Sequence, residues 1–569
     1  MHTRREFPRG TEATSIGRLA RMVSLFFMLA ALASGHNVLA TFTPLSVKET
    51  FARMSPGWNL GNTLDALPIE GGWNNPPVQN VTFSQIYADG FRSVRIPITF
   101  VNQFIAGAPS YTVNATWLSR INYVVDAVSA LATGLYAVVN VHHDSWDWAD
   151  MSGSKPDIDA RKAKFEKLWQ QLATVLKDKN ERLIFESLNE PVGSTQSDAN
   201  VLNDLNLRFT NVVRNTGGNN PQRVLSLPGL NDNAQYLNQW FIAPNNYTSD
   251  KWTVQFHCKS ISPWDFTSNS WGKTFWGSDA DKATVDSEFA QVRENFSVPI
   301  LIGEYGTYSV GSAIEKAAGW AWYDHVVRTA IKYTMVPQWW DNGNDFYDRA
   351  NAKWRDVTTK NIVIAAAAGK INTIPYNGNG TIWLKSGVTT PPSIYLQYNG
   401  NGLKGIYTPS GTALIAGKDY TVVTSPLTGF TLTPSYISSL GSSSTLGEIG
   451  RVIVRSSSGA DLEIDIRRYA RPVISTGTIN VSGSTSDYFI NFSPNGAKLA
   501  TVKAVGPSGE FVKDDWTVWL GEYFKQCNYS GDGDLNGIYN SFHSMGNQRL
   551  RRCRYMVTSN FPIRRIWDK

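Results

Sequence analysis

Two glutamates, each directly after a short apolar stretch, are the residues of this sequence best placed for chemistry. Residues 184–188 are mostly apolar and lead to Asn189 and Glu190, and residues 298–303 are apolar and lead to Glu304. A helix cap or a surface turn would explain the first motif alone. Because a parallel barrel presents polar side chains at the carboxyl ends of its buried strands, the two motifs together predict a paired-carboxylate site.

Two carboxyl groups that face each other can cleave a glycosidic bond. One protonates the leaving oxygen, while the other attacks the anomeric carbon or activates a water molecule. The sugar configuration is retained when the second group is a nucleophile, and the two groups then lie roughly 5–5.5 Å apart. Two carboxyl groups so close should not both ionise readily, so we expect a high pKa for Glu190 and a low pKa for Glu304.

The pattern of apolar runs between residue 57 and about residue 365 predicts an α/β fold, a (β/α)8 TIM barrel. Strand-like runs alternate there with helical patterns such as Ala160–Lys177 and Val201–Arg214. The expected strands are Gly57–Leu60, Ser93–Ile96, Tyr136–Val141, Leu183–Ser187, Val224–Leu227, Thr253–Phe256, Ile300–Ile302 and Val336–Trp339.

Polar or aromatic side chains recur at the ends of these predicted strands, where a barrel gathers its active-site groups. They are Asn62, Arg95, His142, Asn189, Glu190, His257, Glu304 and Trp340. His142, His143 and Asp144 could ligate a metal, but neighbouring residues of a strand point to opposite faces and no third ligand is evident. We therefore expect no metal and no cofactor.

The composition favours a carbohydrate partner over nucleic acid. The 20 tryptophans offer flat rings that stack on sugar faces as well as fill cores. The formal charge of +6 arises at the two ends, because residues 1–40 and 548–569 are rich in arginine. The remaining body is net acidic, so we expect no basic surface for nucleic acid.

The first 40 residues have the features of a secretion signal. An apolar run at 23–34 follows Arg18 and Arg21, and it is too short to span a bilayer comfortably. We expect residues 1–40 to be removed from a secreted, extracellular, monomeric protein that has no membrane segment after cleavage.

A chain of 569 residues is expected to contain two to four domains. Short alternating runs separated by Gly, Ser and Pro turns predict small β-sandwiches after the barrel. The expected parts are a leader (1–40), a barrel domain (41–370), a linker or entry strand (371–388), a β-sandwich (389–470), a second β domain that lacks its last strands (471–530) and an irregular tail (531–569).

Six motifs resemble those of glycoside hydrolase family 5, the retaining (β/α)8 cellulase group, and most of all its secreted endo-β-1,4-glucanases. They are GWNLGNTLDA (57–66), FRSVRIPITF (91–100), VVNVHHDSWDW (138–148), IFESLNEP (184–191), IGEYG (302–306) and QWWDNG (338–343). The resemblance covers about residues 45–365. It implies hydrolysis of internal bonds of cellulose or a related β-1,4-linked polysaccharide, which would be the partner of this protein.

The resemblance also implies a role for each matching residue. Glu190 would be the acid/base, and Glu304 the nucleophile, held ionised by Arg95. Asn189 would bind the sugar 2-hydroxyl group, His142 and His257 would line the −1 subsite, and Trp340 would stack on the sugar there. The candidate substrate-binding residues are Asn62, Arg95, His142, His143, Asn189, His257 and Trp340.

One stretch departs from the family pattern, which usually has His-x-Tyr before a Ser-Pro-aromatic-Asp-Phe run. The family tyrosine donates a hydrogen bond to the nucleophile. This chain reads HCKSISPWDF (257–266), so Cys258 and Lys259 stand where aromatic residues are expected. A thiol is a weak donor and an ammonium sits on a flexible stem, so we expect a slower enzyme.

Three alternatives stay open at this point. Xyloglucan or mannan would be a different substrate for the same family, and a catalytically impaired glucan-binding protein would be a different class.

Two weaker resemblances concern the C-terminal part. Residues 389–470 resemble the immunoglobulin-like modules that follow many such barrels, and residues 475–525 resemble carbohydrate-binding module family 46. The second resemblance makes Trp516 and Trp519 candidate sugar contacts, although core packing would explain one of them equally well.

Overall fold

A computed structural model describes residues 42–130, 134–153, 155–244, 250–258, 276–307, 316–378 and 380–474, with short pieces at 488–490, 492–497, 503–505, 538–540 and 554–556. Within these residues, no helix combines the length and the apolar character needed to cross a membrane. The predicted leader, Lys259, Trp516 and Trp519 lie outside the described residues.

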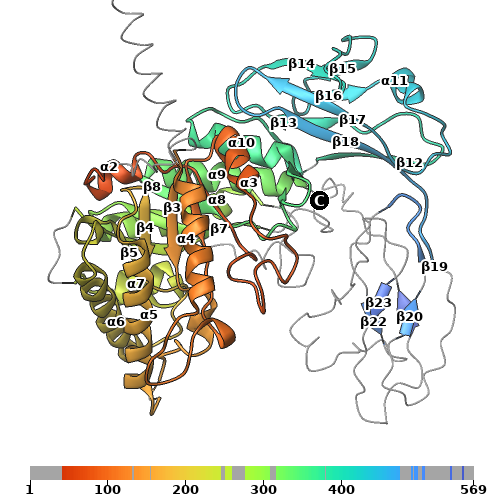
Figure 1. Ribbon diagram of the computed structural model, residues 1–569. Helices are drawn as coiled ribbons and strands as arrows, with labels where there is room; N and C mark the ends of the chain where they lie inside the picture. The colour runs from red at the N-terminus through yellow and green to blue at the C-terminus, as the bar shows by residue number, and fades with distance from the viewer. Residues whose placement is uncertain are drawn as a thin grey trace, which may run out of the picture. The chain divides into compact units, whose positions relative to one another are not determined.

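Eight parallel strands close into a barrel in the order of the sequence (Figure 1), which confirms the predicted fold class. They are β1 (Gly57–Asn59), β2 (Ser93–Ile96), β3 (Tyr136–Asn140), β4 (Leu183–Glu186), β5 (Leu225–Pro228), β6 (Trp252–His257), β7 (Ile300–Tyr305) and β8 (Met335–Trp339). Parallel strands covered on both faces read as continuous apolar runs, which is why the sequence located all eight. Every residue of these strands is buried except Glu304, which is partly exposed.

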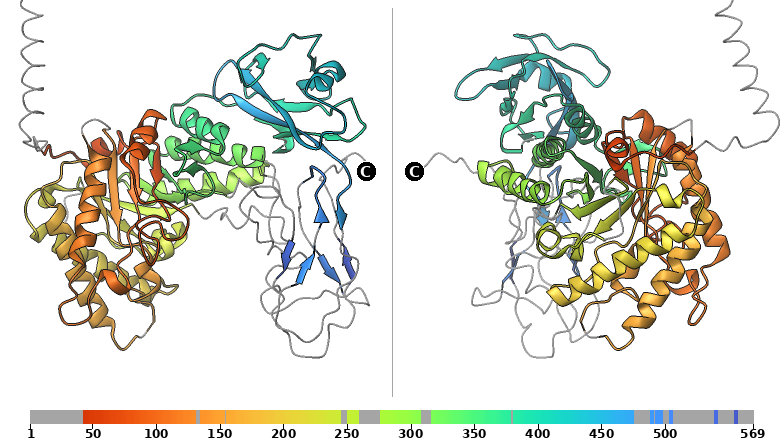
Figure 2. Two further views of the ribbon diagram at one scale, coloured as in Figure 1. Left: turned by 45° about the vertical axis from the view of Figure 1, so that its right-hand side comes forward. Right: turned by 90° about the vertical axis from the view of Figure 1, so that its left-hand side faces the viewer.

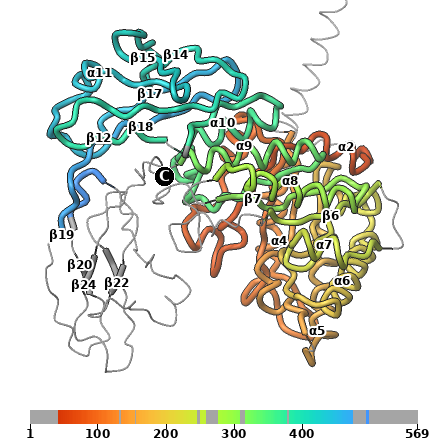
Figure 3. Tube along the Cα trace, turned by 180° about the vertical axis from the view of Figure 1, so that it is seen from behind, coloured from red at the N-terminus to blue at the C-terminus, as the bar shows by residue number. Residues whose placement is uncertain are grey.

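Helices cover the outside of the barrel because each has an apolar face. In α5, the buried Phe165, Leu168, Leu172 and Leu176 recur at spacings of three and four residues. α5 and α6 contact each other outside the strands (Figures 2 and 3). The helices of the described residues are α2 (Val47–Phe51), α3 (Asn80–Ala88), α4 (Ala115–Ser129), α5 (Ile158–Leu176), α6 (Gln196–Asn215), α7 (Ala234–Trp240), α8 (Asp279–Asn295), α9 (Lys316–Lys332), α10 (Val357–Ala367) and α11 (Pro434–Ser439).

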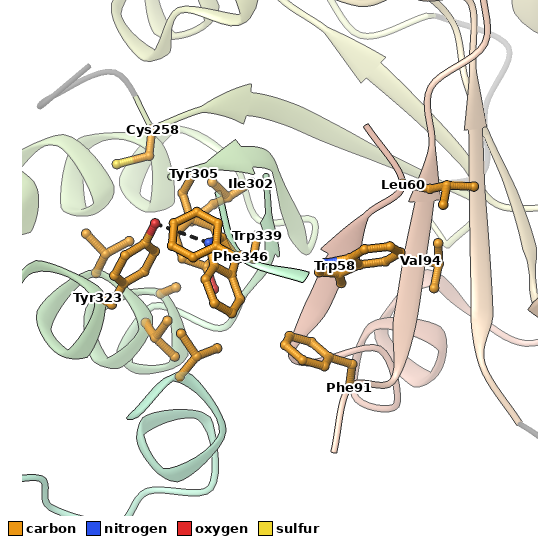
Figure 4. Packing of buried hydrophobic residues seen from close by; sticks show 14 of the residues in the cluster. Trp58, Leu60, Phe91, Val94, Cys258, Ile302, Tyr305, Tyr323, Trp339 and Phe346 are labelled. Atoms are coloured by element: carbon orange, nitrogen blue, oxygen red, sulfur yellow. Dashed lines mark hydrogen bonds between the residues drawn. The ribbon is translucent and has the colours of Figure 1, made fainter. Parts of the chain in front are cut away.

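Aromatic side chains fill much of the space around the strands. Trp58 and Trp339 lie opposite each other on the paired strands β1 and β8, and both are fully buried. The indole N–H of Trp339 donates to the hydroxyl group of Tyr323 in α9 at 3.2 Å (Figure 4). Core packing therefore accounts for part of the tryptophan content that the composition assigned to sugar stacking.

A separate buried cluster closes one end of the barrel. Phe51 of α2 packs there with Tyr136, Ile184 and Leu301, which are the first or second residues of their strands. The amino-terminal ends of the strands are thus covered, and the opposite ends, which lead to Glu190 and Glu304, form the mouth.

Two four-stranded sheets follow the barrel. One has the order β11 (Ile374–Pro375), β13 (Ile394–Gln397), β16 (Gly429–Leu432), β15 (Tyr420–Val423), and the other β12 (Thr381–Lys385), β18 (Leu462–Tyr469), β17 (Gly447–Ser456), β14 (Leu403–Tyr407). Residues 371–388, predicted as a linker or entry strand, contain β11 and β12.

Beyond residue 470, the described pieces form three two-stranded pairs. They are β19 (Val473–Ile474) with β21 (Phe492–Ser493), β20 (Tyr488–Ile490) with β23 (Ile538–Asn540), and β22 (Lys503–Val505) with β24 (Arg554–Met556). β23 and β24 fall within 531–569, so the prediction of an irregular tail is wrong for these residues. Strands of three residues are too short to show a period-two pattern.

We expect Leu172→Ala to lower the free energy of unfolding by about 2–5 kcal/mol, because it removes a fully buried side chain of α5. Val175→Ala is the matched control, since Val175 lies on the same helix and is 41% exposed; its effect should stay within about 0.5 kcal/mol. Urea unfolding followed by tryptophan fluorescence measures both. Equal losses in the two variants would contradict the packing of α5 on the barrel.

Candidate active site

The guanidinium group of Arg95 in β2 lies at the centre of the site and is fully buried. It donates to the two carboxylate oxygens of Glu186 at 2.8 and 2.7 Å, and to Oε1 of Glu304 at 2.7 Å. It also donates to the side-chain oxygens of Asn59 at 3.0 Å and Asn189 at 2.8 Å. One side chain therefore ties together groups carried by β1, β4 and β7.

A bulge in β7 sets the direction of the Glu304 side chain. The register of β7 against β8 skips between Ile302 and Tyr305, and its register against β6 shifts where His257 meets Glu304. Bulges of this kind re-aim side chains beside active sites. Gly303 lies in the bulge, and a Cβ atom there would come within 3.0 Å of Nε2 of His257. The glycine thus lets the imidazole approach the nucleophile candidate.

Glu190 follows β4 with a backbone φ of 39°, a left-handed conformation that is uncommon for a residue with a side chain. Its N–H donates to Oδ2 of Asp232 at 2.8 Å, and the preceding N–H of Asn189 donates to the carbonyl group of Val141 at 2.9 Å. These bonds hold a conformation that costs on the order of 1–3 kcal/mol.

The structure brings Glu190 and Glu304 together beside His257. Nδ1 of His257 lies 3.0 Å from Oε1 of Glu190 and 3.7 Å from Oε2 of Glu304. One carboxylate oxygen of each glutamate lies within 4.8 Å of the other. This approach suits a nucleophile and an acid/base, whose carboxyl groups lie roughly 5–5.5 Å apart in retaining enzymes. Both side chains are about one-fifth exposed, at 21% and 20%, so a substrate can reach them.

Three carboxylates surround His257 and determine its protonation. Its Nε2 atom lies 3.2 Å from Oδ2 of Asp232, on the side of the ring away from Glu190. Burial by itself lowers the pKa of His257, but the charges of Glu304, Asp232 and Glu190 outweigh burial and raise that pKa. Burial raises the pKa of Asp232 to about 7, although the nearby imidazole opposes the rise.

The pKa of Glu304 lies above its ordinary value, so the prediction of a low pKa was wrong. Burial is the largest cause, and the positive charges of His257 and Arg95 offset it only in part. The sequence indicated Arg95 as a partner, but it did not show how deeply the carboxylate would be buried.

His142 and Trp340 form a second wall of the site. Their rings are parallel to within 4°, with centroids 5.8 Å apart. Burial lowers the pKa of His142 well below its ordinary value, so its ring is neutral. The amide of Asn140 lies 3.2 Å from Nδ1 of that ring. With the Asn140 amide as donor, Nδ1 accepts and Nε2–H remains a donor.

His143 and Asn62 lie outside the carboxylate cluster. The ring of His143 packs between Trp73 and Trp146, with centroid distances of 5.3 and 4.8 Å. The side-chain amide of Asn62 donates to Asn74 at 3.0 Å within its own loop. Their roles as substrate contacts stay predictions.

The expectation that His142 and His143 point to opposite faces of a strand was wrong, because β3 ends before them. Their ring centroids lie 4.5 Å apart, and with Asp65 they could offer ligand atoms within 4.8 Å of one another. Glu190, Glu304 and His257 could likewise offer ligand atoms within 4.8 Å of one another. In that second cluster, Arg95 and the imidazole supply the positive charge that a metal would provide.

Four buried polar side chains of the site were missing from the sequence-based candidates: Asn59, Asn140, Glu186 and Asp232. Asn59 and Asn140 are the last residues of β1 and β3, so the strand-end rule could have found them. Glu186 is the last residue of β4, so the same rule could have found it, whereas Asp232 lies in a turn after β5, where that rule gives no signal.

Cys258 lies in the hydrophobic core near Tyr305 (Figure 4). Its backbone N–H donates to the carbonyl group of Glu304 at 2.9 Å. The expected effect of Lys259 falls outside the described residues.

Comparisons with known proteins agree with this geometry. The family model for cellulase, glycosyl hydrolase family 5, matches residues 56–346. Endoglucanase B of Paenibacillus lautus is 31% identical over 512 residues, which cover 86% of this chain and 86% of that protein.

Two solved structures show the same fold. A tri-modular family 5 (subfamily 4) endo-β-1,4-glucanase from Bacillus licheniformis, complexed with cellotetraose, has a TM-score of 0.77 and 39% identity over 87% of this chain and 94% of that chain. A family 5 xyloglucanase from Paenibacillus pabuli has a TM-score of 0.51 and 31% identity over 56% of this chain and 99% of that chain. The family expected from the motifs is confirmed, and the matched region contains both glutamates: this chain belongs to glycoside hydrolase family 5.

Proposed function

We propose that this protein is a retaining endo-β-1,4-glucanase that cleaves internal bonds of cellulose or a related β-1,4-glucan. The observation that carries the proposal is the approach of the Glu190 and Glu304 carboxylates to within 4.8 Å at the barrel mouth. The relatives support the substrate class, because the matched proteins of Paenibacillus lautus and Bacillus licheniformis are endoglucanases.

The reaction has two steps in this arrangement. Glu304 attacks the anomeric carbon and forms a covalent glycosyl-enzyme, while Glu190 gives its proton to the leaving oxygen. Ionised Glu190 then takes a proton from a water molecule, which attacks the same carbon and releases Glu304. Two inversions leave the product with the configuration of the substrate.

The surrounding groups position the sugar. The side-chain oxygen of Asn189 accepts from Arg95, so its NH2 group remains available to donate to a sugar hydroxyl. Neutral His142 offers an Nε2–H donor, and the parallel ring of Trp340 offers a flat face to the sugar.

The choice among β-1,4-linked polysaccharides rests on the relatives. The Bacillus licheniformis enzyme holds cellotetraose, which favours an unbranched glucan, and the Paenibacillus pabuli enzyme is a xyloglucanase, which makes xyloglucan the second candidate. Initial rates of hydrolysis of carboxymethyl-cellulose, xyloglucan and galactomannan would rank these three polysaccharides as substrates. Binding without any product would instead favour a glucan-binding protein.

The setting proposed for this activity is extracellular. The apolar run at 23–34 after two arginines supports export, and the net acidic body supports a neutral polysaccharide as partner over nucleic acid. The protein would act as a monomer after removal of residues 1–40.

The stereochemistry of the product tests the mechanism directly. We expect NMR spectra recorded early in the hydrolysis of a cello-oligosaccharide to show the β-anomer of the new reducing end, followed by slow mutarotation. The α-anomer as first product would mean that water attacks directly, and it would contradict the retaining mechanism.

Glu304→Gln should lose nearly all turnover but still bind glucan, because the amide keeps the shape and removes the nucleophile. Activity on carboxymethyl-cellulose and affinity electrophoresis in a glucan gel measure the two properties. Asp324→Asn is a control of the same kind, since Asp324 lies on α9 and pairs with Arg328 away from the site. Retained turnover in Glu304→Gln would place the nucleophile elsewhere.

The acidic limb of the kcat/KM profile should lie above pH 4.3, roughly the pKa of an ordinary glutamate, because burial raises the pKa of Glu304. The nucleophile is lost as the pH falls through this raised pKa. Removing the positive charge in His257→Asn should move the limb to still higher pH, whereas His325→Asn on α9 should not move it. A shift to lower pH in His257→Asn would contradict the assignment of the limb to Glu304.

A further inference from the structure

The turn after β5 forms three hydrogen bonds with the loop that carries Glu190. The backbone N–H of Asn231 donates to the carbonyl group of Pro191 at 2.7 Å, and its side-chain amide donates to the carbonyl group of Gly193 at 2.8 Å. Asp232 adds the third bond, because its Oδ2 atom accepts the N–H of Glu190 at 2.8 Å. The strained backbone of Glu190 is thus held from a neighbouring strand.

The carboxylate of Asp232 faces more than this one N–H. It is fully buried, and the same Oδ2 atom lies 3.2 Å from Nε2 of His257. Its other oxygen accepts from the side-chain amide of Gln255 at 3.3 Å. Nδ1 of His257 in turn lies 3.0 Å from Oε1 of Glu190. Asp232 therefore contacts the backbone of Glu190 directly and the carboxyl group of Glu190 through one imidazole.

We propose that Asp232 is a positioning residue for the acid/base, which acts on Glu190 through His257 and through the Glu190 backbone. This inference rests on the proposed function, because it presumes that Glu190 is the acid/base. Asp232 itself is buried behind the imidazole and does not touch the substrate.

The chemistry of the imidazole explains why a carboxylate is needed at this position. The negative charge of Asp232, 3.2 Å from Nε2, favours the form of His257 that carries a proton on that nitrogen. Nδ1 is then free to accept a hydrogen bond from protonated Glu190, and a ring protonated on both nitrogens can donate to ionised Glu190. An amide at position 232 can turn its NH2 group toward Nε2, which favours the other tautomer and leaves the proton of Glu190 without its acceptor.

The test compares Asp232→Asn with the parent enzyme on two aryl β-cellobiosides. The phenyl compound needs a proton from Glu190 to leave, whereas 2,4-dinitrophenolate leaves without one. We expect kcat/KM for the phenyl compound to fall on the order of tenfold to hundredfold, the effect of losing a charge-assisted hydrogen bond, and kcat/KM for the dinitrophenyl compound to fall much less. Azide, which attacks without a general base, should restore part of any lost kcat on the dinitrophenyl compound.

A second buried carboxylate provides the control. Asp144 is also fully buried and accepts a backbone N–H, that of Phe100 at 2.9 Å. Asp144→Asn should lower the midpoint of thermal unfolding without any preference for one leaving group. An equal fall for both aryl compounds in Asp232→Asn, or no fall for either, would overturn the proposal.

Failure of the proposed function would look different. A parent enzyme inactive on both aryl compounds and on carboxymethyl-cellulose would refute the glucanase itself, whereas an active parent without the leaving-group split refutes only the role of Asp232. Asp232→Ser is measured in the same way if Asp232→Asn does not fold, because its hydroxyl group still accepts the N–H of Glu190 without supplying a charge.

Discussion

The buried guanidinium of Arg95 is the group on which the rest of the site depends. A planar fork with five N–H donors can bind one carboxylate with two bonds and still reach other acceptors, which an ammonium cannot do. Here two of its bonds go to Glu186, and the remaining bonds fix Glu304 and orient Asn189 and Asn59. Because an unpaired charge in this position would be strongly destabilising, Glu186 makes the buried arginine tolerable and leaves it available to the nucleophile.

Two irregularities of the backbone place the glutamates at the required distance. Regular β7 would direct Glu304 along the normal alternation of the strand, and the bulge at Gly303 changes that direction. Glu190 takes a left-handed backbone conformation in the loop that follows β4, and the turn that contains Asp232 holds it there. The regular parts of the strands make the barrel rigid, and their irregular ends set the positions of the two glutamate side chains.

The sequence predicted the barrel strands and both glutamates because these depend on local patterns. An apolar run followed by a polar residue is visible in one dimension, as before Glu304. The contacts that decide protonation are not visible in this way, since Asp232 and Glu186 meet the site only after the barrel closes. The same limit explains the error in the pKa of Glu304, because a charged partner can be read from a motif but burial cannot. The short strands β23 and β24 were missed because three residues carry no periodic signal.

The barrel mouth contains more carboxyl groups than positive charges, and this imbalance favours the binding of a proton. Glu186, Glu190, Glu304 and Asp232 are four carboxyl groups, whereas Arg95 and a protonated imidazole are at most two positive charges, since burial keeps His142 neutral. Burial is the main cause of the raised pKa values of Asp232 and Glu304, and the charge of Glu190 raises both further, so the site favours binding a proton. A retaining glycosidase needs one carboxyl group protonated and another ionised at the same pH. Among the described contacts, Arg95 bonds to Glu304 and not to Glu190, so the ionised form is favoured at Glu304. The proton that the site binds therefore remains on the side of Glu190, His257 and Asp232.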